Sequence, residues 1–247
     1  MAAATAKAAH RPLLKIKLGG DGDDARISAV RKAAPESELI VDANEAWTPD
    51  NLEHNLAACA NAGVTLVEQP LPAGRDEALA RIKRPIAVCA DESVHDRASL
   101  EGLRDRYDAV NIKLDKTGGL TEALAMADAA HALGFEIMIG CMVATSLAMA
   151  PAMLLARQAS FVDLDGPLLL AHDRDGGLRY DGSLVYPPEA ALVGLMRQPV
   201  PRQPHHAAAD ERHRRHHVID ALPVAAHRPC PTRSTRALAT MPPQAAR

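Results

Sequence analysis

The sequence predicts an α/β fold, a (β/α)8 barrel of the TIM type that is incomplete in this chain. Short apolar segments alternate with helical patterns along residues 13–164. Each apolar segment ends near an ionisable or polar residue, and successive ones lie 22 to 27 residues apart, the length of one strand plus one helix. Strands connected by helices run parallel, and a barrel gathers the ends of all its strands at one mouth.

Seven strands are expected, at residues 13–18, 39–41, 65–67, 86–90, 109–114, 136–139 and 161–164. Helices are expected at 2–9, 25–34, 50–62, 76–82, 98–106, 121–133 and 146–157. An open doubly wound sheet would concentrate its ligand residues at one switch point, whereas here they follow consecutive strands. A complete barrel of this type has eight strands, so the seven expected strands are one too few. We therefore expect the first barrel strand to be absent, which makes segment 13–18 the second.

Composition indicates a protein with a sizeable core of aliphatic side chains, because 47% of residues are hydrophobic and only 2% aromatic. The net charge of -3 argues against nucleic acid as the main ligand. The four cysteines form no C-x-x-C pair, which favours a reducing compartment over disulfides or a zinc ribbon. No apolar stretch reaches the ~18 residues of a membrane span. We expect a cytoplasmic protein with a small-molecule substrate and no membrane partner; a homo-oligomer is left open.

The C-terminal segment differs from the rest of the chain. From residue 197 onward it contains nine Arg, six His and eight Pro but three acidic residues, and it has no apolar periodicity. Such a segment cannot bury enough apolar surface to fold. Two regions are therefore expected, a partial barrel at 1–195 and a disordered Arg/His/Pro-rich tail at 196–247. The abrupt change in composition resembles translation in an altered frame.

Lysines mark two strands that are far apart in the predicted barrel. Lys15 and Lys17 share one face of the first strand, opposite Leu14 and Ile16, and Lys113 lies four strands further on. In a ring of eight strands, Lys17 and Lys113 would face each other across the mouth, where one could remove a proton and the other return it to the opposite face. The charge of Lys15 would favour the neutral, basic form of the Lys17 amine. An alternative of equal weight is that Lys15 has no role in the site and is a solvated lysine at the end of a strand.

Three carboxylates lie on the strands between the lysines, at Asp42, Glu68 and Asp91. With no His or Cys among them, they would form an all-oxygen site, for which Mg²⁺ is the natural cation. The metal and the surrounding lysines would stabilise the enediolate formed when a proton is removed next to a substrate carboxylate. This combination predicts a racemase or epimerase that acts by 1,1-proton transfer.

At these residues the chain resembles the enolase superfamily, in particular dipeptide epimerases of the L-Ala-D/L-Glu type and N-acylamino acid racemases. The resemblance covers residues 2–195 and rests on Lys15-x-Lys17, Asp42-Ala43-Asn44, Glu68-Gln69-Pro70, Ala90-Asp91-Glu92-Ser93, Asn111-Ile112-Lys113 and Asp163-Leu164-Asp165. It implies that Lys17 and Lys113 are the acid/base pair and that Mg²⁺ is held by Asp42, Glu68 and Asp91. It also implies an N-terminal capping domain, for which we expect no counterpart in this chain.

Further residues are expected to contact the substrate. By the same resemblance, Asp163 and Asp165 would hold the free α-ammonium group of a dipeptide. Cys141 and Met142 end a predicted strand and are expected to line the pocket, Cys141 as part of its wall rather than as a nucleophile, because no His is its neighbour in sequence.

Two alternatives to an epimerase stay open. One is another reaction of the same superfamily, a cycloisomerisation or the dehydration made by o-succinylbenzoate synthases. Asp163-x-Asp165 favours the epimerase, because those other substrates have no ammonium group. The second alternative is an inactive, truncated gene product.

Overall fold

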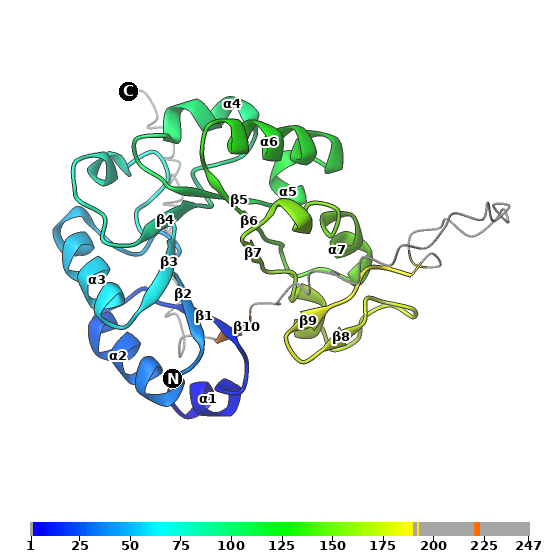
Figure 1. Cartoon of the computed structure of the whole chain (residues 1–247), viewed down its shortest axis with the longest axis horizontal. Helices are drawn as coiled ribbons and strands as arrows, with labels where there is room; N and C mark the ends of the chain where they lie inside the picture. Colours follow the sequence, from blue (N-terminus) through cyan, green and yellow to red (C-terminus); the bar gives the residue numbers. More distant parts are fainter. Residues whose placement is uncertain (1, 190–191, 193–219, 223–247) are drawn as a thin grey trace, which may run out of the picture.

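The computed structural model describes residues 2–189, 192 and 220–222. Its main feature is a curved parallel sheet in the strand order β10-β1-β2-β3-β4-β5-β6-β7, with helices on its outer side (Figure 1). The seven strands that the sequence predicts are β1 Leu13–Lys17, β2 Glu38–Asp42, β3 Val64–Glu68, β4 Ala87–Ala90, β5 Ala109–Ile112, β6 Glu136–Ile139 and β7 Phe161–Val162. They form the curled, incomplete barrel that the strand and helix pattern indicates.

Each strand places alternate side chains on opposite sides of the sheet. In β1, Leu14 and Ile16 pack into the core beneath the helices, whereas Leu13 and Lys15 point inward. The inner layer takes one buried side chain from each of six strands, namely Leu13, Ile40, Leu66, Cys89, Ala109 and Met138. Four of these residues are the third of their strands and two are the first, so the layer fills the interior below the carboxyl ends of the strands. Polar side chains are therefore left to the opposite, carboxyl ends of the strands.

Three long helices cover the outer face: α2 Asp23–Ala33, α3 Pro49–Asn61 and α6 Leu120–Ala132. Helix α3 begins as its sequence predicts, because Pro49 occupies the first turn and the backbone N–H of Thr48 is bound by the side chain of Asn51. Its buried face consists of Leu52, Asn55, Leu56 and Cys59. The shorter helices are α1 Ala2–Ala8, α4 Arg97–Leu100, α5 Leu114–Thr117 and α7 Ser146–Ala152.

Three predicted helices are wrong in length or type. Segment 76–82 contains only the 3-10 turn η1 Glu77–Ala80, and segment 98–106 divides into α4 and the 3-10 turn η2 Glu101–Leu103. Gly102 weakens helix continuation there. Segment 146–157 divides into α7, which contains Pro151, and the 3-10 turn η3 Ala156–Gln158. The 3-10 turn η4 Gly166–Leu169 follows β7.

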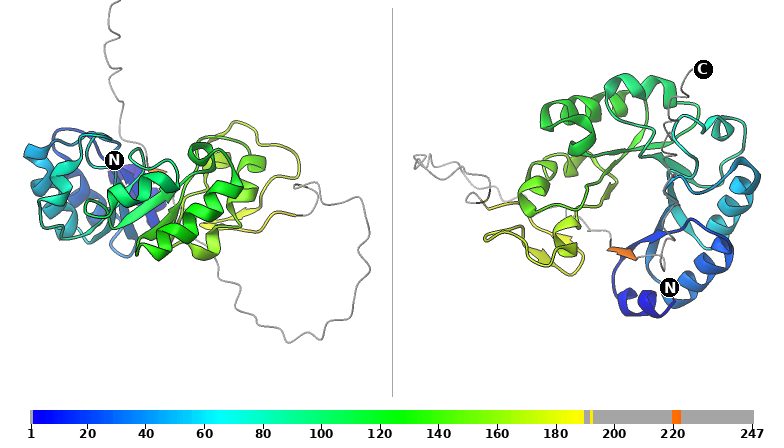
Figure 2. Two further views of the ribbon diagram at one scale, coloured as in Figure 1. Left: turned by 90° about the horizontal axis from the view of Figure 1, so that it is seen from above. Right: turned by 180° about the vertical axis from the view of Figure 1, so that it is seen from behind.

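Two small elements lie outside the predicted pattern. An antiparallel hairpin joins β8 Tyr180–Asp181 to β9 Leu184–Val185 through Gly182, whose φ of 57° suits a tight turn. Strand β10 Asp220–Leu222 runs parallel to β1, on the side where a complete barrel has its first strand (Figure 2). The register pairs Leu14, Lys15 and Ile16 of β1 with residues 220–222 of β10.

Apart from β10 itself, the predicted disordered tail at 196–247 lies outside the described residues. Among the described residues, no helix combines the length and the apolar composition needed to cross a membrane.

Candidate active site

Charged side chains gather where the parallel strands end. Lys17, Asp42 and Glu68 are the last residues of β1, β2 and β3, and the strand register pairs Lys17 with Asp42 and Asp42 with Glu68. Asp91 and Lys113 directly follow β4 and β5. β1 and β5 lie on different sides of the curved sheet (Figure 1). The structure thus brings these predicted residues to one edge, the edge on which barrels carry their sites.

Lys15 occupies the centre of this group. Its ammonium nitrogen lies 2.7 Å from Glu68 Oε2, 3.0 Å from Asp163 Oδ2 and 3.1 Å from Asp42 Oδ2. The residue is only 3% exposed, so the alternative of a solvated strand-end lysine is wrong. Burial by itself lowers the pKa of Lys15, but the three carboxylates raise it well above its ordinary value. Lys15 is therefore a permanent positive charge in the site.

Lys17 has a more open setting on the same strand. Its ammonium group donates hydrogen bonds to Asp42 Oδ2 at 2.5 Å and to Asn44 Oδ1 at 2.8 Å, and its side chain is 32% exposed. Burial alone would raise the pKa of Asp42, but Lys15 and Lys17 together lower it. Asn44 holds its backbone at a φ of 43°, a left-handed conformation that Asn tolerates better than most residues. The sharp turn after β2 thus returns the Asn44 side chain to Lys17.

Asp91 binds two lysines at once. Its Oδ2 accepts from Lys113 and its Oδ1 from Lys116, each at 2.6 Å. Burial opposes ionisation, yet these two charges hold the pKa of Asp91 well below its usual range. Burial lowers the pKa of Lys113, whereas Asp91 and Glu68 raise it, and the net shift is upward.

Lys116 is a site residue that the sequence interpretation missed. It also donates to the carbonyl oxygen of Asn111 at 2.9 Å. Its only sequence signal is its spacing of three residues from Lys113, the residue that directly precedes the short helix α5.

Glu68 is fully buried between the other carboxylates. Its Oε1 accepts a hydrogen bond from Asn111 Nδ2 at 2.7 Å. Burial and the neighbouring Asp42 raise the pKa of Glu68 to about 8, outweighing the attraction of Lys15. The Asn111 amide fits only because residue 140 is glycine, since a Cβ there would lie 2.5 Å from Asn111 Oδ1. Gly140 and Asn111 therefore position Glu68.

The predicted metal ligands do not form a ready-made metal site. Within the described part of the chain, no group of three or more His, Cys, Asp or Glu side chains is arranged to hold a metal ion. The physical reason is that lysine ammonium groups bind the same carboxylate oxygens.

The chemistry of the donors nevertheless fits a hard cation. Asp163 Oδ1 is a buried acceptor without a hydrogen-bond partner, Glu68 Oε2 is paired with the Lys15 ammonium group, and the acidic side chains of the cluster offer oxygen ligands alone. Asp42, Glu68 and Asp91 are the residues that could hold such an ion, once the lysines give way.

Asp163 and Asp165 are both buried and lie beyond the end of strand β7. Strand β7 ends at Val162, so the strand predicted at 161–164 is two residues too long, and Asp165 directly precedes the turn η4. The hydroxyl of Tyr180 donates to the carbonyl oxygen of Leu164 at 2.7 Å and fixes the chain between them. Tertiary contacts rather than strand geometry place the two carboxylates.

Cys141 and Met142 differ in their surroundings. Burial, with a smaller contribution from Asp163, raises the pKa of the Cys141 thiol to about 12, which suits a wall residue and not a nucleophile. Met142 is 48% exposed, and its place in the wall of a substrate pocket stays a prediction.

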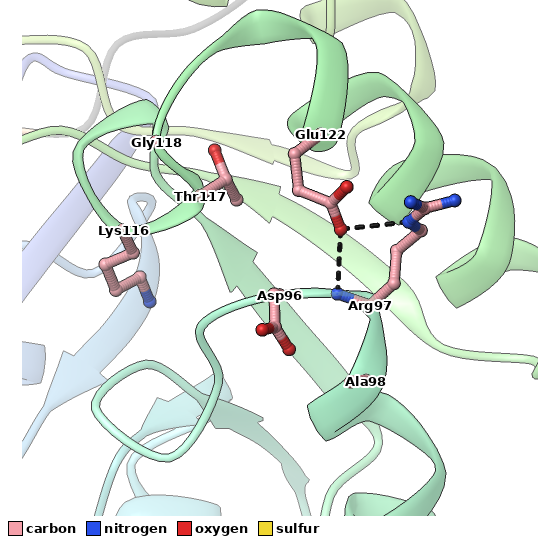
Figure 3. A pocket seen from close by; sticks show the side chains of 7 residues that line it. All are labelled: Asp96, Arg97, Ala98, Lys116, Thr117, Gly118 and Glu122. Atoms are coloured by element: carbon pink, nitrogen blue, oxygen red, sulfur yellow. Dashed lines mark hydrogen bonds and ion pairs between the residues drawn. The ribbon is translucent and has the colours of Figure 1, made fainter.

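A separate surface depression of about 650 Å³ lies beside the site, between the loops after β4 and β5 (Figure 3). Arg97 and Glu122 form an ion pair in it at 2.9 Å. Lys116 lines one side, but its ammonium group is bound to Asp91. The remaining lining residues are Asp96, Ala98, Thr117 and Gly118. This depression adjoins the charged cluster without containing the predicted catalytic residues.

A curled parallel sheet with lysines and carboxylates interleaved at its carboxyl edge defines a partial (β/α)8 barrel with a polar site at its mouth. Comparison with known families gives a more specific result: the chain belongs to the enolase C-terminal domain-like family, whose model matches residues 1–195.

Two curated relatives cover about the same region. An N-acetyl-D-glutamate racemase of Pseudoalteromonas sp is 52% identical over 183 residues, which are 74% of this chain and 58% of that protein. The L-Ala-D/L-Glu epimerase of Escherichia coli K12 is 49% identical over 178 residues, which are 72% of this chain and 56% of the relative. The chain therefore spans little more than half the length of these relatives.

Solved structures agree with this result. A crystal structure of an enolase family member from Agrobacterium tumefaciens, with homology to dipeptide epimerases and with bound sodium and L-Ala-L-Glu, has a TM-score of 0.76 at 63% identity. The match covers 77% of this chain and 59% of that one. A dipeptide epimerase from Cytophaga hutchinsonii, complexed with Mg and D-Ala-L-Val, has a TM-score of 0.71 at 27% identity and covers 76% and 55%.

Proposed function

We propose that this barrel belongs to an Mg²⁺-dependent isomerase, an epimerase or racemase that moves the proton on the carbon next to a carboxylate. The observation that carries the proposal is the division of the lysines. Lys17 at the end of β1 binds Asp42, and Lys113 after β5 binds Asp91, so one lysine stands at each end of a row of three carboxylates. Two such lysines can serve the two faces of one substrate carbon.

Asp42, Glu68 and Asp91 are the proposed Mg²⁺ ligands. The surroundings of Glu68 Oε2 support this role, because this buried, acceptor-only oxygen lies 2.7 Å from the Lys15 ammonium group and so already has a cation beside it. Bound Mg²⁺ would draw electron density from the substrate carboxylate and so acidify the hydrogen on the adjacent carbon. The dipeptide epimerase from Cytophaga hutchinsonii that resembles this chain was solved with Mg.

The lysines would move the proton itself. A neutral lysine amine takes the proton from the α carbon and becomes an ammonium group, and the lysine on the opposite side gives its own proton to the other face. The carboxylates beside Lys113 hold it as an ammonium group, which suits a donor. Lys15 adds a fixed positive charge beside Lys17. Reversing the two roles gives the reverse reaction.

The proposed substrates are dipeptides such as L-Ala-D/L-Glu, or N-acylated amino acids. Asp163 supports a dipeptide, because its Oδ1 is buried without a donor and could accept from a substrate ammonium group. The proteins that resemble this chain include both kinds of enzyme, an L-Ala-D/L-Glu epimerase and an N-acetyl-D-glutamate racemase. The cytoplasm is the proposed location, since Cys59, Cys89 and Cys141 are free thiols.

Exchange of the α-hydrogen in deuterated water tests the two-lysine mechanism. With the full chain and Mg²⁺, Lys113→Ala should abolish epimerisation but still exchange the hydrogen of the one epimer that faces Lys17, and Lys17→Ala should show the opposite preference. Proton NMR of each epimer with each variant measures this, and Lys32→Ala, an exposed lysine on α2, is the control. Equal loss of exchange from both epimers in both variants would rule the mechanism out.

A further inference from the structure

A buried polar network lies directly behind the carboxylates. Its central residue, Gln69, follows Glu68 at the end of β3 and is completely buried. Its backbone has a φ of 35°, a left-handed conformation that is uncommon for a residue with a side chain. Such a conformation persists only where the surrounding contacts stabilise it.

The Gln69 amide uses both its acceptor and its donors. Oε1 accepts hydrogen bonds from the backbone N–H of Asp91 at 2.9 Å and of Ser93 at 3.0 Å. Nε2 lies 2.8 Å from the carbonyl oxygen of Leu71 and 2.9 Å from both Ser93 Oγ and Tyr107 Oη. A flipped amide would bring its NH₂ group against two N–H donors, so only one orientation satisfies the network.

A carboxylate on the outer side fixes this orientation. Asp76 Oδ2 accepts from Tyr107 Oη at 2.5 Å and from Ser93 Oγ at 2.6 Å, while its Oδ1 is paired with Arg106. Burial alone raises the pKa of Asp76, but the hydrogen bonds from Ser93 and Tyr107 and the charge of Arg106 lower it. Because an ionised carboxylate only accepts, both hydroxyl groups direct their hydrogens to Asp76 and their lone pairs remain for Gln69.

We propose that Gln69 is a positioning residue that fixes Asp91 relative to Glu68. Glu68 and Gln69 are consecutive on β3, whereas Asp91 follows β4, so the two hydrogen bonds to Gln69 Oε1 join two carboxylates from different strands. Lys113 and Lys116 are both bound to Asp91 and depend on the same anchor. The part of the inference that concerns Mg²⁺ rests on the proposed function.

Amide hydrogen exchange of the full chain without metal tests the anchor directly. Gln69→Met keeps the side-chain length and removes every hydrogen bond, and Ser93→Ala is the milder variant. Exchange of the Asp91 amide should become about tenfold faster in Gln69→Met, which removes the hydrogen bond to that amide. It should become about threefold faster in Ser93→Ala, which only weakens this hydrogen bond. Ser37→Ala is the matched control, because its buried hydroxyl donates to the carbonyl oxygen of Arg11 at the opposite end of the strands.

The proposal that Gln69 fixes Asp91 would be overturned if the Asp91 amide exchanged at an unchanged rate in Ser93→Ala and in any folded Gln69→Met protein. Calorimetric titration with Mg²⁺ alone provides the second readout. The affinity of Ser93→Ala should be about tenfold weaker than that of Ser37→Ala, as for other residues that orient metal ligands. Equal affinities in the two variants would overturn the positioning role. Failure of the unmodified chain to bind Mg²⁺ would contradict the proposed function. The hydrogen-exchange result would still decide whether Gln69 fixes Asp91.

Discussion

The segment from β1 to β5 and the segment after β6 differ in how their large apolar side chains are buried and how their charged side chains are paired. In the first, the large apolar side chains are buried, and each charged residue at the mouth has an oppositely charged partner. In the second, strand β7 has only two residues. All six exposed large hydrophobic side chains of the described residues lie there, at Met142, Val143, Leu147, Leu154, Leu168 and Leu169.

The difference separates residues at a barrel mouth that are fixed by buried ion pairs from residues that are exposed and gain little from packing. Lys15, Lys17 and Lys113 bind carboxylates that are themselves buried, so moving one charge leaves another uncompensated. On the β6–β7 side, Met142, Val143 and Leu169 gain little from packing, because water reaches about half of each surface. We therefore expect substitutions to be costly on the first side and nearly neutral on the second.

Among the substitutions that test this difference, Lys15→Met should have the largest effect on the free energy of unfolding. It leaves three buried carboxylates without their shared cation and should reduce the free energy of unfolding by about 3–5 kcal/mol at pH 7. The pKa of Lys15 is raised in the folded state, so its contribution is fully present below its unfolded pKa and is lost only as the pH rises through the folded value.

Urea unfolding at pH 7 and pH 5.5 measures this. The deficit of the variant should shrink at the lower pH, because the uncompensated carboxylates can then bind protons. Lys32→Met, at an exposed position on α2, is the control. A loss below about 1 kcal/mol at pH 7, the value typical of a surface ion pair, would contradict the buried role of Lys15.

Gly140→Ala tests the point where the two sides meet, and its expected effect is smaller. The new methyl group would be placed 2.5 Å from Asn111 Oδ1, and such overpacking costs about 1–3 kcal/mol. Displacement of Asn111 would also remove its hydrogen bond to Glu68 and should weaken Mg²⁺ binding. Thermal unfolding and calorimetric titration give the two values.

Gly102→Ala is the matched control for that substitution, since its nearest outside atom is 4.0 Å away. It should leave the stability unchanged or raise it by about 0.4–1 kcal/mol. If Gly102→Ala and Gly140→Ala proved equally stable and bound Mg²⁺ equally well, the close approach of Asn111 would not matter.

Leu169→Ser should have the smallest effect. The side chain is 58% exposed in the turn η4, so the free energy of unfolding should change by no more than about 0.5 kcal/mol. Leu56→Ala, on the buried face of α3, should by contrast cost about 2–5 kcal/mol. Chemical denaturation compares them. Losses of similar size would mean that Leu169 is covered, and the contrast between the two sides would fail.

Some features of the site could be predicted from the sequence and others could not. The alternation of LLKIK places Lys15 and Lys17 on one face whatever the rest of the chain does, and the spacing of one strand plus one helix brings Asp42 and Glu68 to the same edge. No local pattern identified Lys116 or Tyr107. Their roles arise from contacts with Asp91 and with Gln69 across 25 and 38 residues of sequence.

The sequence by itself determined the strand and helix order, the incomplete barrel and the residues at the strand ends, because side-chain periodicity and turn residues act over a few positions. Only the tertiary structure decided how these residues are partnered. Whether a buried carboxylate faces a lysine, an amide or no donor depends on which strands become neighbours. That is why the structure places Lys15 among three carboxylates and leaves Asp163 Oδ1 without a hydrogen-bond donor.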